Sequence, residues 1–517
     1  MKSISLALLI EERARETPDL PFLLDAAGAA ITFGAYRDSV ARLAGWLAST
    51  GVGGDMLVAW QLPTSVEAVT LTGALAWLGV RQSPVLPLYR QRELSSLAVE
   101  CEPAMLITRS QWRGARGVEI AQAAADAVEK ARLGGRPRVL VLDSLPSEST
   151  ASLPKPADRD SSAVRWIFYT SGTTSAPKGV LHTDDSLGAG AAGLVERYGI
   201  TAEDRYSMLF PFTHVGGIQM LFMQLMTGAS AVMFDRFEGR ETFEVVRKLG
   251  VTMLSGAGPV TQVAFDVQQE HPDVRVLPKL RLAITGAARK SPTVHYRIKE
   301  RLGGLGALSC YGLTESPMAV LSSFSDTDEQ LAETEGRPIS GCHIRIVDDQ
   351  GSELPTGEAG EILIRGPQMM TGYVNAEASA NAFDAQGYFR TGDLGTLDAG
   401  GYLRVTGRLK DIINRKGEKI SAAEVEEVLE RHPAIAEVAA IALPSRASGE
   451  CCCAVVALRD AASLDLADLA AFCRAEGLAT YKIPERLEII EALPRNASGK
   501  VLKPELVGRF SADGGDS

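Results

Sequence analysis

The sequence predicts an α/β protein of at least two domains. Its 517 residues are too many for a single hydrophobic core. Strand-like and helix-like patterns alternate as far as residue 301, which favours mostly parallel sheets covered by helices. Short β-runs split by turns follow over 336–367, and mixed strands and helices fill 412–517. We therefore expect a large N-terminal domain of stacked α/β subdomains with a small β-subdomain, and a small α+β C-terminal domain.

Individual elements follow from residue patterns. Apolar residues at helical spacing over 32–50 predict a helix with Thr32 as its N-cap, and Ser421 with Glu424 forms a capping box that opens another helix. Residues 283–288 read as a strand that ends in small residues. The predicted helices are 4–10, 32–50, 66–78, 114–133 and 421–432, and the predicted strands are 56–60, 138–142, 164–169, 283–288 and 451–457.

Composition excludes several classes of protein. Apolar residues make up 45% and charged residues 23%, with a net charge of −11 spread along the chain, which argues against nucleic acid as a partner. No apolar run reaches the roughly 18 residues that a membrane helix needs, and residues 4–10 lack a signal-peptide cleavage site. The seven cysteines form no Cys-x-x-Cys pair, so we expect free thiols in the reducing cytoplasm.

A hydroxyl-rich loop between residues 168 and 180 is the strongest local signal. The predicted strand 164–169 opens into a run of Thr, Ser and Gly that Pro177 and Lys178 close. Converging N–H and O–H donors with one lysine predict a phosphate site. The P-loop of nucleotide triphosphatases is excluded because Lys178 follows proline and precedes Gly179. A solvated Ser/Thr linker is the alternative. The run comprises Thr170, Ser171, Gly172, Thr173, Thr174 and Ser175.

This loop resembles the signature loop of the adenylate-forming superfamily, which contains acyl-CoA synthetases, luciferases and the adenylation domains of peptide synthetases. One departure is Ser175, where that loop usually carries glycine. Two further motifs follow in the family's order, SCYGLTE at 309–315 and PRNASGK at 494–500. The resemblance covers nearly the whole chain. Because of residues 84–94, the chain most resembles cyclohexanecarboxylate and medium-chain acyl-CoA ligases.

The resemblance implies an ATP site with Mg²⁺. The hydroxyl-rich loop and Lys178 would hold the β- and γ-phosphates, Glu315 with Thr170 would place the metal, and Lys500 would reach the acid and the α-phosphate together. A helix N-terminus capped by Thr314 is the alternative for the second motif. The implied catalytic residues are Lys500, Thr314, Glu315 and Arg408. The implied nucleotide and coenzyme A residues are Thr170, Ser171, Gly172, Thr173, Thr174, Lys178, Gly286, Ala287, Ala288, Tyr311, Gly312, Asp393, Arg408, Lys410 and Gly417.

The resemblance also implies a mobile C-terminal domain. It places an adenylation domain over 1–407, a hinge over 408–411 that pivots at Lys410, and the moving domain over 412–517. After adenylation the small domain would swing, bringing the turn at Gly417 against the pantetheine channel of coenzyme A. The basic residues Arg415, Lys416 and Lys419 either meet the 3′-phosphate of coenzyme A or form a solvated face.

The acyl site is expected at His214, which follows Phe210-Pro-Phe-Thr. Taken alone, this histidine would more often be a packed core residue. No Asp occupies 215–219 to pair with the ammonium of an amino acid, and the pocket candidates are apolar or small, which suits a carbon chain or ring. The predicted substrate residues are His214, Gly216, Gly217, Leu313 and Met318.

Together these features predict an ATP-dependent carboxylic acid:CoA ligase that forms an acyl adenylate and releases AMP and pyrophosphate. The expected acid is medium-chain, alicyclic or steroid-derived, and the expected assembly is a monomer or homodimer. The alternatives are an aryl-acid or luciferase-like adenylating enzyme, and a degenerate protein that only binds acyl adenylate or AMP. Intact Lys178, Glu315, Asp393, Arg408 and Lys500 count against the degenerate protein.

Overall fold

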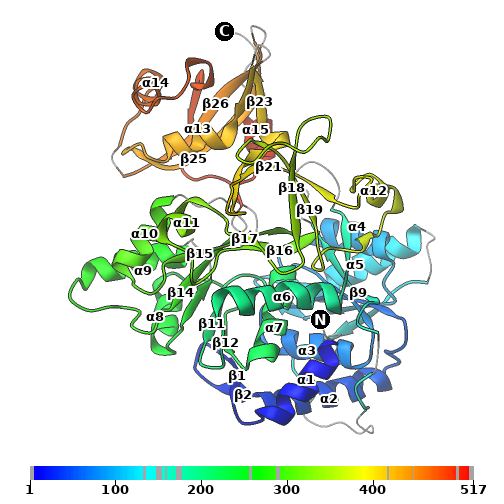
Figure 1. Ribbon diagram of the computed structural model, residues 1–517. Helices are drawn as coiled ribbons and strands as arrows, with labels where there is room; N and C mark the ends of the chain where they lie inside the picture. Colours follow the sequence, from blue (N-terminus) through cyan, green and yellow to red (C-terminus); the bar gives the residue numbers. More distant parts are fainter. Residues whose placement is uncertain are drawn as a thin grey trace. The chain divides into compact units, whose positions relative to one another are not determined.

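Parallel strands and covering helices form most of the protein, as the alternating pattern predicts (Figure 1). The computed structural model describes residues 5–131, 135–146, 154–157, 160–170, 177–255, 259–286, 292–415, 418–445, 448–460, 462–495 and 500–511. Two compact units divide the chain. The large unit runs to His343 and includes Arg365–Gly387, and the small unit holds Ile344–Ile364 and Tyr388–Ser517. The predicted mixed α/β class, with a large N-terminal and a smaller C-terminal part, is confirmed.

One sheet of the large unit carries the hydroxyl-rich loop. Its strands lie in the order β20, β10, β9, β4, β3, β5 and β8, and the last five run parallel. The buried aromatic residues Trp166 and Phe168 make β9 a core strand, as their spacing predicts. These strands are β20 (Gly372–Tyr373), β10 (Gly179–Thr183), β9 (Val164–Tyr169), β4 (Arg81–Pro84), β3 (Leu57–Gln61), β5 (Met105–Thr108) and β8 (Arg138–Val141). A short hairpin, β6 (Gln111–Trp112) and β7 (Ala115–Arg116), stands beside them.

The second sheet of the large unit is parallel at its centre and antiparallel at its ends. It buries an apolar core beneath helices α8 (Arg240–Lys248), α9 (Pro259–Glu270) and α10 (Pro292–Arg301). In order across the sheet, its strands are β17 (Arg337–Pro338), β16 (Ser316–Leu321), β15 (Ala307–Leu313), β14 (Leu282–Gly286), β13 (Met253–Ser255), β11 (Arg205–Met208), β12 (Ser230–Met233), β1 (Pro21–Leu24) and β2 (Ala30–Thr32).

Helices cover both sheets of the large unit. Thr32 caps α2 by accepting a hydrogen bond from the N–H of Ala35, as predicted. In the part of the chain that the structure describes, no helix combines the length and apolarity needed to cross a membrane. The helices are α1 (Leu6–Glu16), α2 (Phe33–Ser49), α3 (Val66–Trp77), α4 (Gln91–Cys101), α5 (Gly117–Lys130), α6 (Asp184–Tyr198), α7 (Val215–Thr227), α8 (Arg240–Lys248), α9 (Pro259–Glu270), α10 (Pro292–Arg301), α11 (Asp328–Glu333) and α12 (Ala376–Ala380).

The small unit contains an antiparallel sheet and an α+β module. The sheet comprises β18 (His343–Val347), β19 (Gly360–Arg365), β21 (Phe389–Leu397) and β22 (Leu403–Arg408), which confirms the predicted β-subdomain. Cys452 and Cys453 are buried in strand β26, as predicted. The module comprises η1 (Leu409–Asp411), β23 (Ile412–Arg415), β24 (Glu418–Ser421), α13 (Ala422–Leu429), β25 (Ile435–Ser445), β26 (Gly449–Leu458), α14 (Leu466–Ala475), η2 (Thr480–Lys482), β27 (Arg486–Ile489) and α15 (Lys503–Ser511).

The predicted capping box of α13 is wrong. The helix begins where expected, but the side chain of Ser421 makes no capping hydrogen bond. Its hydroxyl donates instead to the carbonyl of Thr406, at 3.1 Å. The Ser421 hydroxyl therefore donates to a tertiary acceptor and does not accept from the N–H groups of the first helical turn. The predicted hinge over 408–411 concerns motion and stays a prediction.

Candidate functional site

The ends of the hydroxyl-rich loop are joined as a β-hairpin. Strands β9 and β10 pair Tyr169 with Gly179. The N–H of Thr170 donates to the carbonyl of Lys178 at 3.2 Å, and the N–H of Lys178 lies 3.3 Å from the hydroxyl of Thr170. Both residues therefore flank the mouth of the loop. The remaining predicted loop residues, Ser171, Gly172, Thr173 and Thr174, lie outside the described residues.

The second motif forms a β-hairpin. Strand β15 carries Tyr311, Gly312 and Leu313, and Thr314 and Glu315 form the turn before β16. The alternative of a helix capped by Thr314 is therefore wrong. A side chain at Gly312 would place its Cβ 2.7 Å from the N of Met318, so only glycine fits this turn.

Neighbouring strands fix the backbone of this turn. The ring of His182 donates from Nε2 to the carbonyl of Thr314 at 2.7 Å, and the N–H of Met370 donates to the carbonyl of Glu315 at 2.8 Å. Burial lowers the pKa of His182 to about 4, so the ring is neutral at physiological pH. Strand β14 lies alongside, and Gly286 at its end pairs with Cys310. The predicted residues Ala287 and Ala288 fall outside the described part of the chain.

A single tyrosine contacts both charged residues of this region. The hydroxyl of Tyr373 donates to Oε1 of the buried Glu315 carboxylate at 2.7 Å. The ammonium of Lys178 lies 5.1 Å from the centre of the Tyr373 ring, within reach of a cation–π interaction. Lys178 and Glu315 are thereby brought together.

This arrangement fits Mg²⁺. No cluster of three or more His, Cys, Asp or Glu that could hold a metal occurs among the described residues. Mg²⁺ does not need one, because it is usually held by one or two carboxylates together with substrate phosphates and water. The second oxygen of Glu315 has no hydrogen-bond partner among the described residues, whereas Tyr373 engages Oε1. A hard oxygen ligand is thus joined through Tyr373 to Lys178, which closes the predicted phosphate loop.

A small cavity lies beside Thr314 and His214. His214 caps α7, because its Nδ1 accepts the N–H of Gly216 at 3.2 Å, and this leaves the proton on Nε2. Burial lowers the pKa of His214 to about 4, so it would act as a neutral donor. The cavity is lined by Pro84, Val85, Leu86, Tyr89, Leu97, Phe168, Tyr169, Thr213, His214, Val215 and Thr314.

The other predicted substrate residues lie outside this lining. Gly217 packs against its own turn, where an added Cβ would lie 2.3 Å from the carbonyl of Phe212. The buried Met318 has its sulfur 2.9 Å from that of Cys310. Gly216 and Leu313 are likewise absent from the described lining. Of the predicted substrate residues, His214 lines this cavity, and it is joined there by Tyr89, Leu97 and Tyr169, which were not predicted.

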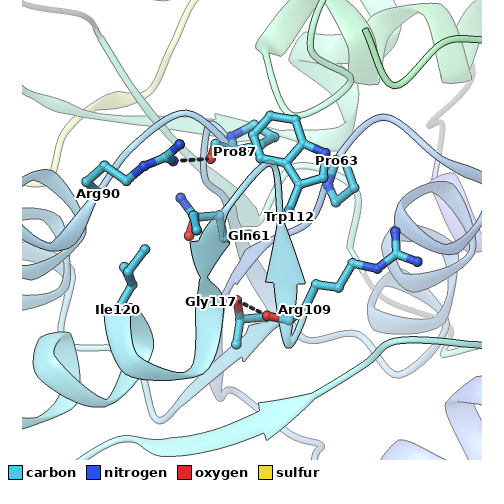
Figure 2. Close-up of a pocket in the computed structure, with 10 residues that line it drawn as sticks. Gln61, Pro63, Pro87, Arg90, Arg109, Trp112, Gly117 and Ile120 are labelled. Atoms are coloured by element: carbon cyan, nitrogen blue, oxygen red, sulfur yellow. Dashed lines mark hydrogen bonds between the residues drawn. The ribbon is translucent and has the colours of Figure 1, made fainter.

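A second small cavity is lined in part by Pro87 and Arg90, from the same turn at 84–90 (Figure 2). Gln61, Arg90 and Trp112 point toward it, and Arg90 donates to the carbonyl of Pro87 at 3.1 Å. None of the predicted site residues lines the described part of this cavity.

The small unit brings together the remaining predicted residues. Asp393 on β21 pairs with Arg408 on β22, and Nε of Arg408 lies 2.9 Å from the buried Asp393 carboxylate. Burial lowers the pKa of Lys500 to about 8, with a further lowering by Arg408 and Lys410. Four predicted residues therefore share one electrostatic environment. Gly417 lies outside the described residues.

Two members of the predicted coenzyme A patch are already paired within the small unit. Arg415 contacts Glu485 at 2.5 Å, and Lys419 contacts Asp349 at 2.9 Å. Lys416 lies outside the described residues. Because these partners offset two of the three charges, the patch is a weaker phosphate site than the sequence implies.

The family models match most of the chain. The model described as AMP-binding enzyme matches residues 10–374, and the model described as AMP-binding enzyme C-terminal domain matches residues 424–500.

Several relatives are CoA ligases named for different acids. The medium-chain fatty-acid–CoA ligase of Escherichia coli is 30% identical over 98% of this chain and 92% of its own length. The sulfoacetate–CoA ligase of Cupriavidus necator is 32% identical and 97% of each chain is covered. A Rhodococcus jostii propanoyl:CoA ligase, whose acid carries a methyl-dioxo-octahydroindenyl ring system, is 30% identical with 96% of each chain covered.

Solved structures share the architecture. ATP-bound MatB from Rhodopseudomonas palustris matches with a TM-score of 0.87 and 25% identity, covering 98% of this chain and 99% of that one. The o-succinylbenzoate CoA synthetase MenE from Bacillus subtilis, in complex with ATP and a magnesium ion, matches with a TM-score of 0.82 and 28% identity, covering 96% and 98%.

Proposed function

Because this chain belongs to the AMP-binding enzyme family and is an AMP-forming acid–CoA ligase, we propose that its substrate is a medium-chain, alicyclic or steroid-derived carboxylic acid with one carboxylate. The supporting observation is the cavity beside Thr314 and His214. Aliphatic and aromatic side chains dominate it, and its described lining contains no Lys or Arg. A second anionic group on the acid would be desolvated there without a partner, which is costly.

Two relatives are named for acids of this kind, one a medium-chain fatty acid and the other a propanoyl acid bearing a fused ring. The sulfoacetate relative is named for an acid with a second anionic group, and the cavity lining disfavours such an acid for this chain.

For adenylation we assign the residues as follows. The carboxylate oxygen bonds to the α-phosphorus of ATP, the bond from that phosphorus to the bridging oxygen breaks, and pyrophosphate leaves. Thr170 and Lys178 bind the β- and γ-phosphates, and Thr314 orients the α-phosphate. Glu315 and Thr170 would hold Mg²⁺, which when bound offsets phosphate charge.

The other predicted nucleotide residues are assigned as follows. Asp393 accepts hydrogen bonds from the two ribose hydroxyls, and Arg408 steadies that carboxylate and the nucleotide. Lys500 holds the carboxylate of the acid beside the α-phosphate and offsets the negative charge that develops on that phosphate. Tyr311, with Gly286 and Gly312 beside it, offers a flat surface for adenine.

For thioester formation we assign a change of conformation at Lys410. The thiol of coenzyme A attacks the acyl carbonyl, and AMP leaves as the bond between the carbonyl carbon and the phosphate oxygen breaks. Lys410→Pro fixes φ at the hinge. It is expected to stop thioester formation while pyrophosphate release continues. Equal loss of both half-reactions would contradict a hinge at this residue.

A panel of acids tests the substrate class. Pyrophosphate release is measured with ATP and hexanoate, decanoate, cyclohexanecarboxylate, a steroid-derived acid, malonate and sulfoacetate, each with and without coenzyme A. The proposal expects the first four to have higher kcat/KM than the two dianions. A preference for malonate or sulfoacetate would refute it.

A pair of leucines on α4 sharpens this test. Leu94 and Leu97 are equally buried, but only Leu97 lines the described cavity. Leu97→Ala is expected to shift the kcat/KM ratio toward longer or bulkier acids. Leu94→Ala should cost about 2–5 kcal/mol of stability without changing that ratio. If both variants leave the ratio unchanged, the acyl group does not occupy this cavity.

A further inference from the structure

Tyr373 contacts Glu315 and Lys178, which carry opposite charges. The proposed function places both of these residues at the ATP–Mg²⁺ site. We propose that Tyr373 is a positioning residue for this site: its hydroxyl sets the carboxylate of Glu315, and its ring sets the ammonium of Lys178. This inference rests on the proposed metal and phosphate roles of those two residues.

The backbone of Tyr373 is itself firmly placed. Strand β20 pairs with β10 just after Lys178, with Tyr373 opposite Val180, and the N–H of Val374 donates to the carbonyl of Gly179 at 2.7 Å. The N–H of Tyr373 donates to the hydroxyl of Ser379 on α12 at 2.8 Å. The side chain therefore starts from a fixed point beside the mouth of the hydroxyl-rich loop.

At Glu315 the side chain remains to be positioned, because the backbone is already fixed. His182 and Met370 already bind the carbonyls of Thr314 and Glu315, so the remaining freedom is rotation of the carboxylate. The Tyr373 hydroxyl removes that freedom at Oε1. A carboxylate can only accept a hydrogen bond, so the Tyr373 hydroxyl is the donor in this contact. Because this donor is neutral, the carboxylate keeps its full charge for a cation.

Lys178 is held in a complementary way. Its ammonium lies 5.1 Å from the Tyr373 ring centre and makes no hydrogen bond to the described residues. A cation–π contact directs the ammonium without using its N–H donors. Those donors stay available for phosphate oxygens. One side chain can thus orient a cation and an anion together without neutralising either.

The Mg²⁺ dependence of ATP binding tests this proposal. ATP affinity is measured by calorimetry across a series of Mg²⁺ concentrations, alongside pyrophosphate release. Tyr373→Phe keeps the ring and removes the hydroxyl, and should raise the Mg²⁺ concentration needed for half-maximal binding about 10- to 100-fold. The KM for the acid at saturating Mg²⁺ should not change. Tyr373→Leu also removes the ring and should raise the KM for ATP further.

Tyr36→Phe is the matched control, because the buried Tyr36 hydroxyl donates to the carbonyl of Val69 at 3.1 Å, in another part of the large unit. It removes a similar hydrogen bond and should leave the Mg²⁺ dependence unchanged. In the Glu315→Gln background, Tyr373→Phe should add no further Mg²⁺ effect, because it acts through Glu315.

Two outcomes would overturn the inference in different ways. In the first, Glu315→Gln alters the Mg²⁺ dependence of ATP binding, but Tyr373→Phe only lowers the melting temperature, as Tyr36→Phe does. Tyr373 then has a structural role, and the proposed function stands. If Glu315→Gln itself leaves the Mg²⁺ dependence unchanged, the proposed metal role fails, and the inference about Tyr373 fails with it.

Discussion

Asp184 in the large unit is buried and Lys500 in the small unit is half-buried, and their surroundings differ. Burial raises the pKa of Asp184 to about 6 and lowers that of Lys500 to about 8. Asp184 accepts hydrogen bonds from the N–H of Leu6 at 2.9 Å and from the indole of Trp166 at 2.7 Å. Lys500 lies near Arg408 and Lys410, whose charges lower its pKa further.

The comparison shows that a shifted pKa does not by itself identify a site. Asp184 is surrounded by donors that join α1 to β9, so its place is structural. Lys500 is gathered with other cations, an arrangement that a bound anion would stabilise. After burial, the largest influences on the pKa of Asp184 are hydrogen-bond donors, whereas those on the pKa of Lys500 are two like charges. We expect changes at Lys500 to alter chemistry and changes at Asp184 to alter stability.

The largest expected effect is that of Lys500→Ala on acyl-adenylate formation. Loss of a preorganised charge at the α-phosphate should lower this rate by about 10²–10³, or roughly 3–4 kcal/mol. Thioester formation from supplied acyl adenylate should continue, because Lys500 is assigned to the first step only. The two half-reactions are measured separately, as pyrophosphate release and as acyl-CoA formation.

Lys503→Ala provides a control for Lys500→Ala. This nearby lysine is paired with Glu426 at 2.7 Å and is not among the predicted site residues. Its loss should leave adenylation near the wild-type rate. If Lys500→Ala lowers both half-reactions equally, the assignment of Lys500 to adenylation is wrong. The contrast between Lys500, as a group that acts in the reaction, and Asp184, as a group that affects stability, is then lost.

The pH dependence of adenylation is a smaller effect that sharpens the same comparison. With a pKa of about 8, Lys500 loses its proton as the pH rises through 8, and the charge that stabilises the reaction is lost with it. The kcat/KM for ATP, which reports the free enzyme, should therefore fall about tenfold per pH unit above that value. Asp393→Asn removes a charge that raises the pKa of Lys500, so the fall should begin at lower pH. A profile that stays flat well above pH 8 would contradict this assignment.

Local patterns predicted much of the fold. Strand β9 spans Val164–Tyr169 as expected, because its residues pack on both faces, and Thr32 caps α2 through a bond only three residues away. The prediction for Ser421 failed because its hydroxyl bonds to Thr406, on another strand. Local spacing cannot reveal such a competing partner.

The candidate site shows the same limit. Lys178, Glu315 and His214 stood out because each lies in a distinctive short motif. Tyr373 was missed because its partners, Glu315 and Lys178, are 58 and about 195 residues away and meet it only through sheet pairing. His182 was missed for the same reason, since its bond to Thr314 spans 132 residues. Their chemistry depends on topology that no single window contains.

The smallest expected effect is that of Asp184→Asn on thermal stability. Because the pKa of Asp184 is raised from 3.8 to about 6, the fold favours the protonated carboxyl. Its contribution is present below about pH 4 and is lost as the pH rises through 6, by at most roughly 3 kcal/mol. The variant cannot ionise at this position. The melting temperature of the wild type minus that of Asp184→Asn should therefore decrease between pH 4 and pH 7, by a few degrees.

Asp185→Asn, at the half-buried neighbouring position, should show no comparable trend. A difference for Asp184→Asn that stays constant with pH would mean that Asp184 keeps its charge in the fold, which would remove the contrast with Lys500.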